Sequence, residues 1–273
     1  MLAGIITGSG TYALRGLSAA GAVLVRTPYG EVSLTEGRLH GVDVVHVSRH
    51  GSGHERLSNL VNHRANIWAL RERGADCVVA LTACGAVDPD LELGSLVIFD
   101  DLHFISNRLA DGSLCTYFDQ VGDPGRGHWV LHGGPYSAQL VAALTRAALD
   151  AGIAFQAGGT YGHVDGPRFN TPSEIAQLAA CGVCAVSQTG GPETVLSGEL
   201  ELPFALVGFI TDYANDVFPG QPTPITTLFE LVARSAEVFA ELLGAALPLI
   251  AAADGTLAAA GSVVRFARAD PER

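Results

Sequence analysis

The chain has 273 residues, of which 48% are hydrophobic and 16% charged, and its 28 acidic and 16 basic side chains give a net charge of −12. This composition is too apolar for a disordered chain, and the acidic balance argues against nucleic acid or an anionic membrane as the main partner. All 16 basic residues are Arg, which excludes Schiff-base chemistry, pyridoxal attachment and the P-loop lysine.

Short apolar runs that end at glycine or polar turns predict the β-strands. The first strand spans 3–7 and stops at Gly8-Ser9-Gly10. Further strands are expected at 22–26, 43–48, 77–81, 96–100, 183–187 and 204–210. Most of these runs are continuously apolar rather than alternating, which indicates strands covered on both faces.

Helical segments separate the strands. We expect helices over 62–73, 137–151, 171–180 and 226–247, with Gly152 at a helix C-cap. Alternating strands and helices predict an α/β sandwich with a central, mostly parallel mixed sheet flanked by helices. Since no repeat, linker or change of composition interrupts the chain, we expect one domain over 1–253 and a tail over 254–273 that is partly disordered.

Two segments depart from this pattern. Residues 101–134 are rich in Asp, Gly, Asn and Pro and show no periodicity. A loop of that length in a compact domain is typically functional or part of an interface. The apolar run 242–253 is shorter than the ~20 residues that span a membrane, and it predicts the end of a buried helix.

The chain contains five cysteines, and no charged-then-apolar leader precedes them. An odd number without such a leader favours a reduced, cytoplasmic protein. Cys181 and Cys184 have the spacing of a redox motif, but they follow an expected helix instead of opening one. We therefore expect them to be packing residues.

Four polar turns bounded by small residues follow predicted strands, and they contain the candidate site. They are Gly8-Ser9-Gly10, Arg49-His50-Gly51, Thr82-Ala83-Cys84-Gly85 and the segment 187–191 with Thr189. Because ligands bind beyond the carboxyl ends of strands in open α/β sheets, these turns are expected to meet at one pocket. Hydroxyls, one guanidinium and exposed backbone N–H groups are the donors that bind a tetrahedral oxyanion.

The order and spacing of these motifs resemble the purine nucleoside phosphorylase family, most closely its 5′-methylthioadenosine phosphorylase branch. The resemblance covers about residues 3–250 and includes, besides the four turns, His54, the segment 61–70, Gly166-Pro167-Arg168-Phe169, Pro192-Glu193 and Thr211-Asp212-Tyr213. It implies phosphorolysis, in which inorganic phosphate attacks the anomeric carbon of a purine nucleoside and the purine leaves. Such a reaction needs an anion held beneath the sugar and a proton or hydrogen bond at purine N7.

The resemblance also implies roles for individual residues. The phosphate site would comprise Ser9, Arg49, His50, Thr82, Ala83 and Thr189. The nucleoside would contact Phe169, Asn170, Gln188, Asp212, Ala214, Ile225 and Leu228. Asp212 and His50 are the catalytic candidates, with Asp212 as the acid at the base and the aliphatic Ile225 and Leu228 facing an apolar 5′ substituent. No metal or cofactor is expected. A homotrimer is implied, in which a neighbour's loop around 129–136 closes the 5′ pocket.

The chain departs from the family pattern mainly where the nucleoside would bind. Gln188 replaces a usual Met beneath the ribose, Asn170 replaces Glu or Ser, and Ala214 replaces the second acid of Asp-x-Asp. Ser58 replaces a usual Pro, and His63 a usual Tyr. Reaction class is therefore better supported than substrate. 5′-Methylthioadenosine or another 5′-substituted 5′-deoxyadenosine is the main expectation, and a 6-oxopurine or 5′-methylthioinosine substrate is the alternative.

Two other function classes were weighed. A nucleotide-dependent oxidoreductase would carry a third glycine after Gly8-Ser9-Gly10 and an acid ending the second strand, and neither is present. A catalytically silent purine-binding protein gains support from Gln188 and Ala214. The retained phosphate-type residues favour an enzyme over both.

Overall fold

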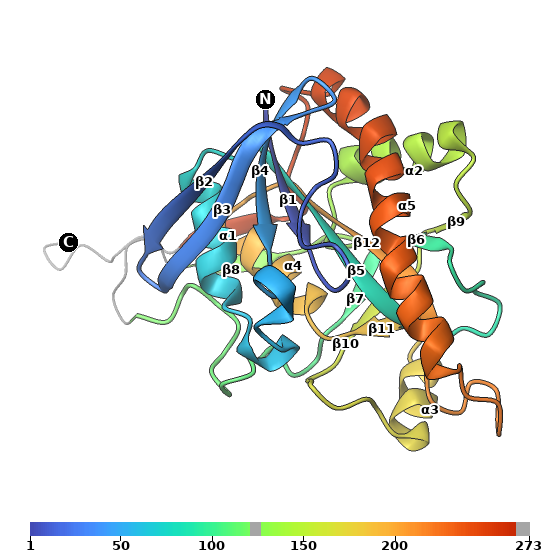
Figure 1. Cartoon of the computed structure of the whole chain (residues 1–273). Coiled ribbons are helices and arrows are strands. Elements are labelled where there is room, and N and C mark those ends of the chain that lie inside the picture. Colours follow the sequence, from blue (N-terminus) through green and yellow to red (C-terminus); the bar gives the residue numbers. More distant parts are fainter. Residues whose placement is uncertain (121–126, 266–273) are drawn as a thin grey trace, which may run out of the picture.

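The computed structural model describes residues 1–120 and 127–265. One large mixed sheet lies between two layers of helices (Figure 1). Its strands are β1 (Leu2–Thr7), β2 (Ser18–Thr27), β3 (Gly30–Leu39), β4 (Val42–Ser48), β5 (Cys77–Ala86), β6 (Leu96–Ile98), β7 (Asp101–His103), β9 (Phe155–Ala157), β10 (Thr160–His163), β11 (Val183–Ser187) and β12 (Phe204–Tyr213). The helices are α1 (His63–Glu72), α2 (Ala138–Ala151), α3 (Pro172–Ala180), α4 (Gly190–Glu199) and α5 (Ile225–Ala252), with single 3-10 turns η1 (Ser52–His54) and η2 (Ser58–Leu60).

The sheet divides at β5. The first half of β5 lies between β1 and β12, which both run parallel to it. Beyond the end of β1, the last two residues of β5 pair antiparallel with β11. β4, β3 and β2 extend the sheet past β1, β10 and β7 extend it past β11, and β6 and β9 extend it past β12. The ends of β1, β5, β11 and β12 therefore meet around one point of the sheet.

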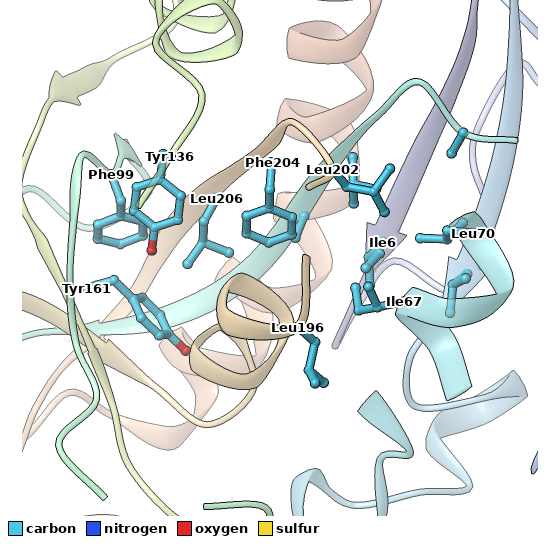
Figure 2. Packing of buried hydrophobic residues seen from close by; sticks show 14 of the residues in the cluster. Ile6, Ile67, Leu70, Phe99, Tyr136, Tyr161, Leu196, Leu202, Phe204 and Leu206 are labelled. Atoms are coloured by element: carbon cyan, nitrogen blue, oxygen red, sulfur yellow. The ribbon is translucent and has the colours of Figure 1, made fainter. Parts of the chain in front are cut away.

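Apolar side chains bury both faces of the sheet. On one face, α2 and α5 pack together and place Leu144 and Leu243 in a fully buried cluster. On the other face, α1 and α4 contribute Ile67 and Leu196, and Figure 2 shows Leu196 beside Phe204 of β12. Because each such side chain stabilises the fold by about 1.5–3 kcal/mol when buried, these helices hold the strand ends in place.

Helix α5 is long and apolar enough to span a membrane by length and composition alone, with 44% of its most apolar window buried inside the molecule. Its buried residues include Phe239, Leu242, Leu247 and Ile250, which pack against the sheet and α2. Core packing accounts for its apolar composition, as expected for 242–253.

The strands and helices expected from the sequence are present, and Gly152 is the left-handed C-cap of α2. Strands β3, β9 and β10 and helix α4 were not expected from the sequence. Strand β3 carries many polar residues and so lacks an apolar run. Helix α4 begins with Gly190-Gly191-Pro192, residues that usually indicate a turn, yet it is buried along most of its length.

The expectation of a continuous loop over 101–134 is wrong in part, because the segment contains β7 and β8 (Gly127–Val130). These strands are only three and four residues long, too short to show a period in the sequence. β8 pairs antiparallel with β13 (Ser262–Arg265), so this part of the tail forms a strand. Residues 121–126 of the loop and 266–273 of the tail lie outside the described residues.

All five cysteines are free thiols, and four of them are buried. Cys181 is the exposed residue and follows α3, whereas Cys184 lies in β11, where burial raises the pKa of its thiol to about 12. A thiol with so high a pKa is a poor nucleophile, which agrees with a packing role for Cys184.

Candidate active site

A cavity of about 270 Å³ lies where the sheet divides. It is bordered by the residues that follow β1, by β5, by the end of β11 and by the end of β12. Of the residues predicted for the site, the cavity brings together Ser9, His50, Thr82, Ala83, Phe169, Asn170, Gln188, Thr189, Asp212, Ala214 and Leu228. Arg49 lies directly behind its wall, and Ile225 lies outside it.

Arg49 is held rigidly at one end of the cavity. Its side chain is fully buried, and Nε and Nη2 donate to the two carboxylate oxygens of Glu193 at 2.7 and 2.9 Å. Nη1 donates to the carbonyl oxygen of Leu81 at 2.7 Å. A Cβ atom at Gly8 would overlap this guanidinium, so the turn before Ser9 lies directly against it. The remaining N–H groups of Arg49 are thus fixed next to the first glycine turn.

His50 lines the cavity beside Arg49 and is neutral at pH 7. Burial and the positive charge of Arg49 lower the pKa of its imidazole to about 4. Nδ1 lies 2.8 Å from the carbonyl oxygen of Arg56, and since a carbonyl only accepts, Nδ1 carries the hydrogen. Nε2 is therefore an acceptor. The ring stacks on His54 with centroids 4.3 Å apart.

Hydroxyls and a helix start complete this end of the cavity. The Oγ1 atom of Thr82 lies 3.3 Å from the hydroxyl of Ser187. Thr189 is the N-cap residue of the buried helix α4, whose N-terminal backbone carries partial positive charge. We call the cavity wall around Ser9, Arg49, His50, Thr82 and Thr189 the donor end. Its composition suits a tetrahedral oxyanion.

Asp212 also lines the cavity, on β12 beside a break in its register with β5. The hydroxyl of Thr211 donates to its Oδ1 atom at 2.7 Å, while Oδ2 faces the backbone of Gly85. Burial raises the pKa of the Asp212 carboxyl. A carboxyl of this kind retains its proton at higher pH than an exposed one, which suits a general acid.

Phe169 and Asn170 border the cavity from the segment 164–170, which connects β10 to α3. Phe169 is 64% exposed, so it does not fill the core and is free to contact a ligand. The amide nitrogen of Asn170 donates to Glu174 at 3.3 Å, which leaves Oδ1 as the acceptor available to a ligand. We call the part of the cavity around Phe169, Asn170, Asp212 and Ala214 the base end.

Gln188 also lines the cavity, but protein groups occupy its amide. Its Oε1 accepts from the hydroxyl of Ser58 at 2.6 Å, and its Nε2 donates to the carbonyl of Arg168 at 3.0 Å. A hydrogen bond from this amide to a hydroxyl of the sugar would therefore compete with these contacts inside the chain.

An apolar wall lies between the two ends. Leu228 and Val232 of α5 and Leu57 line it. Ile225, predicted to share this wall, is 62% exposed at the first position of α5 and does not line the cavity within one chain.

Sequence reasoning missed several lining residues. His54 and Ser187 stood within motifs that the sequence analysis singled out, so their positions carried a signal. No sequence pattern distinguishes Leu57 and Val232, because an aliphatic residue at a cavity wall looks the same in sequence as one in the core.

Residues 3–248 match the family model of the Phosphorylase superfamily, and the chain belongs to this family. It is 35% identical over 83% of its length to 6-oxopurine nucleoside phosphorylase of Pyrococcus furiosus, covering 84% of that protein. It is 37% identical over 92% of its length to S-methyl-5′-thioadenosine phosphorylase of Mycolicibacterium smegmatis, again covering 92% of that protein.

The overall fold also resembles that of a solved phosphorylase. Methylthioadenosine phosphorylase from Schistosoma mansoni, solved in complex with adenine, superimposes with a TM-score of 0.82 at 27% identity, covering 94% of this chain and 93% of that one. The protein is a nucleoside phosphorylase-type α/β enzyme, a pentosyltransferase, as the order of its motifs predicted.

Proposed function

We propose that the protein catalyses phosphorolysis of a 5′-substituted 5′-deoxyadenosine, most simply 5′-methylthioadenosine, to adenine and the pentose 1-phosphate. The observation that carries the proposal is that one cavity brings together a cluster of anion donors and a buried carboxyl. Arg49 and His50 lie at the donor end, and the carboxyl of Asp212 lies at the base end. A nucleoside placed between them presents its anomeric carbon to a bound phosphate and its base to an acid.

The donor end suits hydrogen phosphate. Arg49 supplies a fixed positive charge, and Ser9, Thr82 and the start of α4 supply neutral donors. Because neutral His50 exposes an acceptor, it accepts a hydrogen bond from the hydroxyl of the hydrogen phosphate dianion. The fully deprotonated oxygens are then free to face the sugar.

Bond cleavage places positive charge on the sugar and negative charge on the purine. A phosphate oxygen forms the new bond to the anomeric carbon as the carbon–nitrogen bond to the purine breaks. The electron pair of the broken bond remains on the purine, and the proton of Asp212 neutralises it at N7. Atoms and charge balance without a further reactant.

Adenine is the favoured base because the base end offers acceptors. Oδ1 of Asn170 is available to a ligand, and the carbonyl oxygen of the protonated Asp212 carboxyl accepts from an exocyclic amine. The apolar wall of Leu57, Leu228 and Val232 suits a methylthio group and offers a 5′-hydroxyl no partner.

A 6-oxopurine substrate is the second candidate. The raised pKa of Asp212 favours a protonated carboxyl, which donates a hydrogen bond to a 6-oxo oxygen. Relatives named 6-oxopurine nucleoside phosphorylase are 34–36% identical to this chain, similar to those named S-methyl-5′-thioadenosine phosphorylase.

The test is a panel of purine nucleosides incubated with the protein, with and without phosphate, with released base measured by chromatography. We expect adenine from 5′-methylthioadenosine only when phosphate or arsenate is present. Hypoxanthine released faster from the inosine analogues would select the second candidate. No phosphate-dependent release from any nucleoside would contradict the proposal and favour a silent purine-binding protein.

We further propose that the enzyme is cytoplasmic, needs no metal or cofactor and assembles as a homotrimer. Its five free thiols support a reducing compartment. Exposed apolar residues beside the cavity, Ile225 and Phe229 of α5 among them, suit coverage by a neighbouring subunit. Trp129, Val130 and Tyr136 pack within their own chain, so residues 131–135 are the part of the predicted loop left to reach a neighbour. Analytical ultracentrifugation tests the trimer, and activity after dialysis against a chelator tests whether a metal is needed.

A further inference from the structure

We propose that Gln188, together with Ser58, is a positioning residue for the purine nucleoside. The pair fixes the segment 164–170 so that Phe169 and Asn170 face the bound base. This inference rests on the proposed function, because it assigns Gln188 a part in binding the same substrate.

The geometry of the amide carries the inference. Gln188 follows β11 and reaches two other segments at once: Ser58 of η2 donates to Oε1 at 2.6 Å, and Nε2 donates to the carbonyl of Arg168 at 3.0 Å. One end of the link must accept and the other must donate, which an amide does and a thioether or carboxylate does not. The hydrogen bond from Nε2 thus holds the backbone of Arg168, the residue directly before Phe169.

The three segments touch closely at this point. A Cβ atom at Gly166 would overlap both Oε1 of Gln188 and the hydroxyl of Ser58. The pair therefore lies against the backbone of the segment 164–170 as well as being bonded to it. Glycine at 166 is what permits this approach.

The segment needs such an anchor because Phe169 and Arg168 are exposed. Its ends are tied by the amide of Val164, which donates to the carbonyl of Ser187 at 3.1 Å, and by Asn215, which donates to the carbonyl of Asn170. Gln188 ties the backbone at Arg168, whose exposed side chain is also paired with Glu174 of α3. Loss of this tie leaves the ring of Phe169 on a longer free span, so it occupies its place over the base less often.

A second, small cavity explains why a polar side chain suits position 188. Ser58 and Gln188 line both this cavity of about 10 Å³ and the large one. Its wall includes Asn59, His63 and His163, and a buried polar atom of each has no hydrogen-bond partner among the residues that the structure describes. This space holds about one water molecule. The amide of Gln188 thus lies between the large cavity and the small one. A Met at position 188 would leave the hydroxyl of Ser58 and the carbonyl of Arg168 without their hydrogen bonds to this side chain.

Three variants separate the ties. Gln188→Met removes both hydrogen bonds. Gln188→Glu keeps an acceptor for Ser58 but loses the donor to Arg168, and Ser58→Ala removes the hydroxyl alone. Gln177→Met, at an exposed position of α3, is the matched control. We expect KM for the nucleoside to rise about tenfold in both Gln188 variants and about threefold in Ser58→Ala, with KM for phosphate and kcat changed less than about threefold.

A double variant tests whether Gln188 acts through Phe169. In a Phe169→Ala background, Gln188→Met is expected to raise KM for the nucleoside less than about twofold, because the residue it positions is already absent. Equal rises in KM for phosphate and nucleoside, or a tenfold rise that persists in this background, would overturn the inference.

Hydrogen exchange of the peptide 164–171, followed by mass spectrometry, reports the anchor without any turnover. Faster exchange in Gln188→Met but not in Gln177→Met supports the inference, and unchanged exchange overturns it. If the parent protein releases no base from any nucleoside, the proposed function fails, and the exchange experiment still decides whether Gln188 holds this segment.

Discussion

The two ends of the cavity are built in different ways. At the donor end, Arg49 is buried and bonded on three sides, and Glu193 behind it is also fully buried. At the base end, Phe169 is largely exposed, and the segment that carries it is held by individual side-chain hydrogen bonds. Removing either member of the Arg49–Glu193 pair would leave a charge unpaired in the interior.

The difference follows from what each end would bind. Phosphate is the same in every phosphorolysis, so a fixed arrangement of charge and donors serves it. The nucleoside varies in base and 5′ group, and four of the five residues that depart from the family pattern (Ser58, Asn170, Gln188 and Ala214) line the cavity, while the fifth, His63, lies 3.8 Å from Glu193 behind it. We therefore expect changes at the donor end to remove the reaction and changes at the base end to alter its substrate.

Replacing Arg49 with Met should have the largest effect. Phosphate-dependent base release should fall about 10³-fold because the fixed cation is lost. Stability should fall by about 3–5 kcal/mol, because Glu193 is left as an unpaired buried charge. Enzyme assays and urea denaturation measure the two effects.

The double variant Arg49→Met with Glu193→Met separates these effects. It should regain most of the stability, since no buried charge remains, yet stay inactive. A double variant that recovers activity would show that Arg49 serves the fold and not phosphate.

Asp212→Asn should be the next largest change, lowering kcat/KM for adenine nucleosides about 100-fold. Burial raises the pKa of the Asp212 carboxyl, so the wild-type rate should fall as pH rises through that pKa. The Asn variant should lose this limb of the pH profile and shift its preference toward 6-oxopurines. An unchanged preference would contradict the role of Asp212 in reading the base.

The sequence predicted the donor end better than the base end. Ser9, His50 and Thr189 could be found because each follows a strand, and Thr82 because it stands in the last half of β5, and these strand ends meet at the cavity. Glu193 was noticed as part of a motif, but its bond to Arg49 joins residues 144 positions apart and leaves no local pattern.

At the base end, local patterns were less informative. Ser58 and Gln188 were recognised as unusual residues, yet only the fold brings them together across 130 positions. Ile225 and Leu228 share a helical stripe, and the sequence placed both at the 5′ group. The structure separates them because α5 begins at Ile225, one turn short of the cavity wall.

Acid should destabilise the donor end before the base end. Burial lowers the pKa of His46, beneath this end, to about 4, so the unfolded chain takes up the proton first as pH falls below about 6.5. Stability is therefore lost between pH 6.5 and 4. His46→Gln, which retains a partner for Thr7, should reduce this loss by about 2 kcal/mol, measured by urea denaturation at both pH values. An equal loss in the variant would assign the effect to other groups, such as His50 and His163.

Leu228→Ser should give the smallest effect and sharpen the comparison within one helix. A hydroxyl in the apolar wall should lower the preference for 5′-methylthioadenosine over adenosine about tenfold, because it weakens contact with the thioether and offers the 5′-hydroxyl a partner. Ile225→Ser is the matched control and should change the ratio less than about twofold, because its side chain lies outside the cavity of its own chain. If both variants shift the ratio equally, Ile225 contacts the substrate in the assembled enzyme, and the apolar wall is then built by more than one subunit.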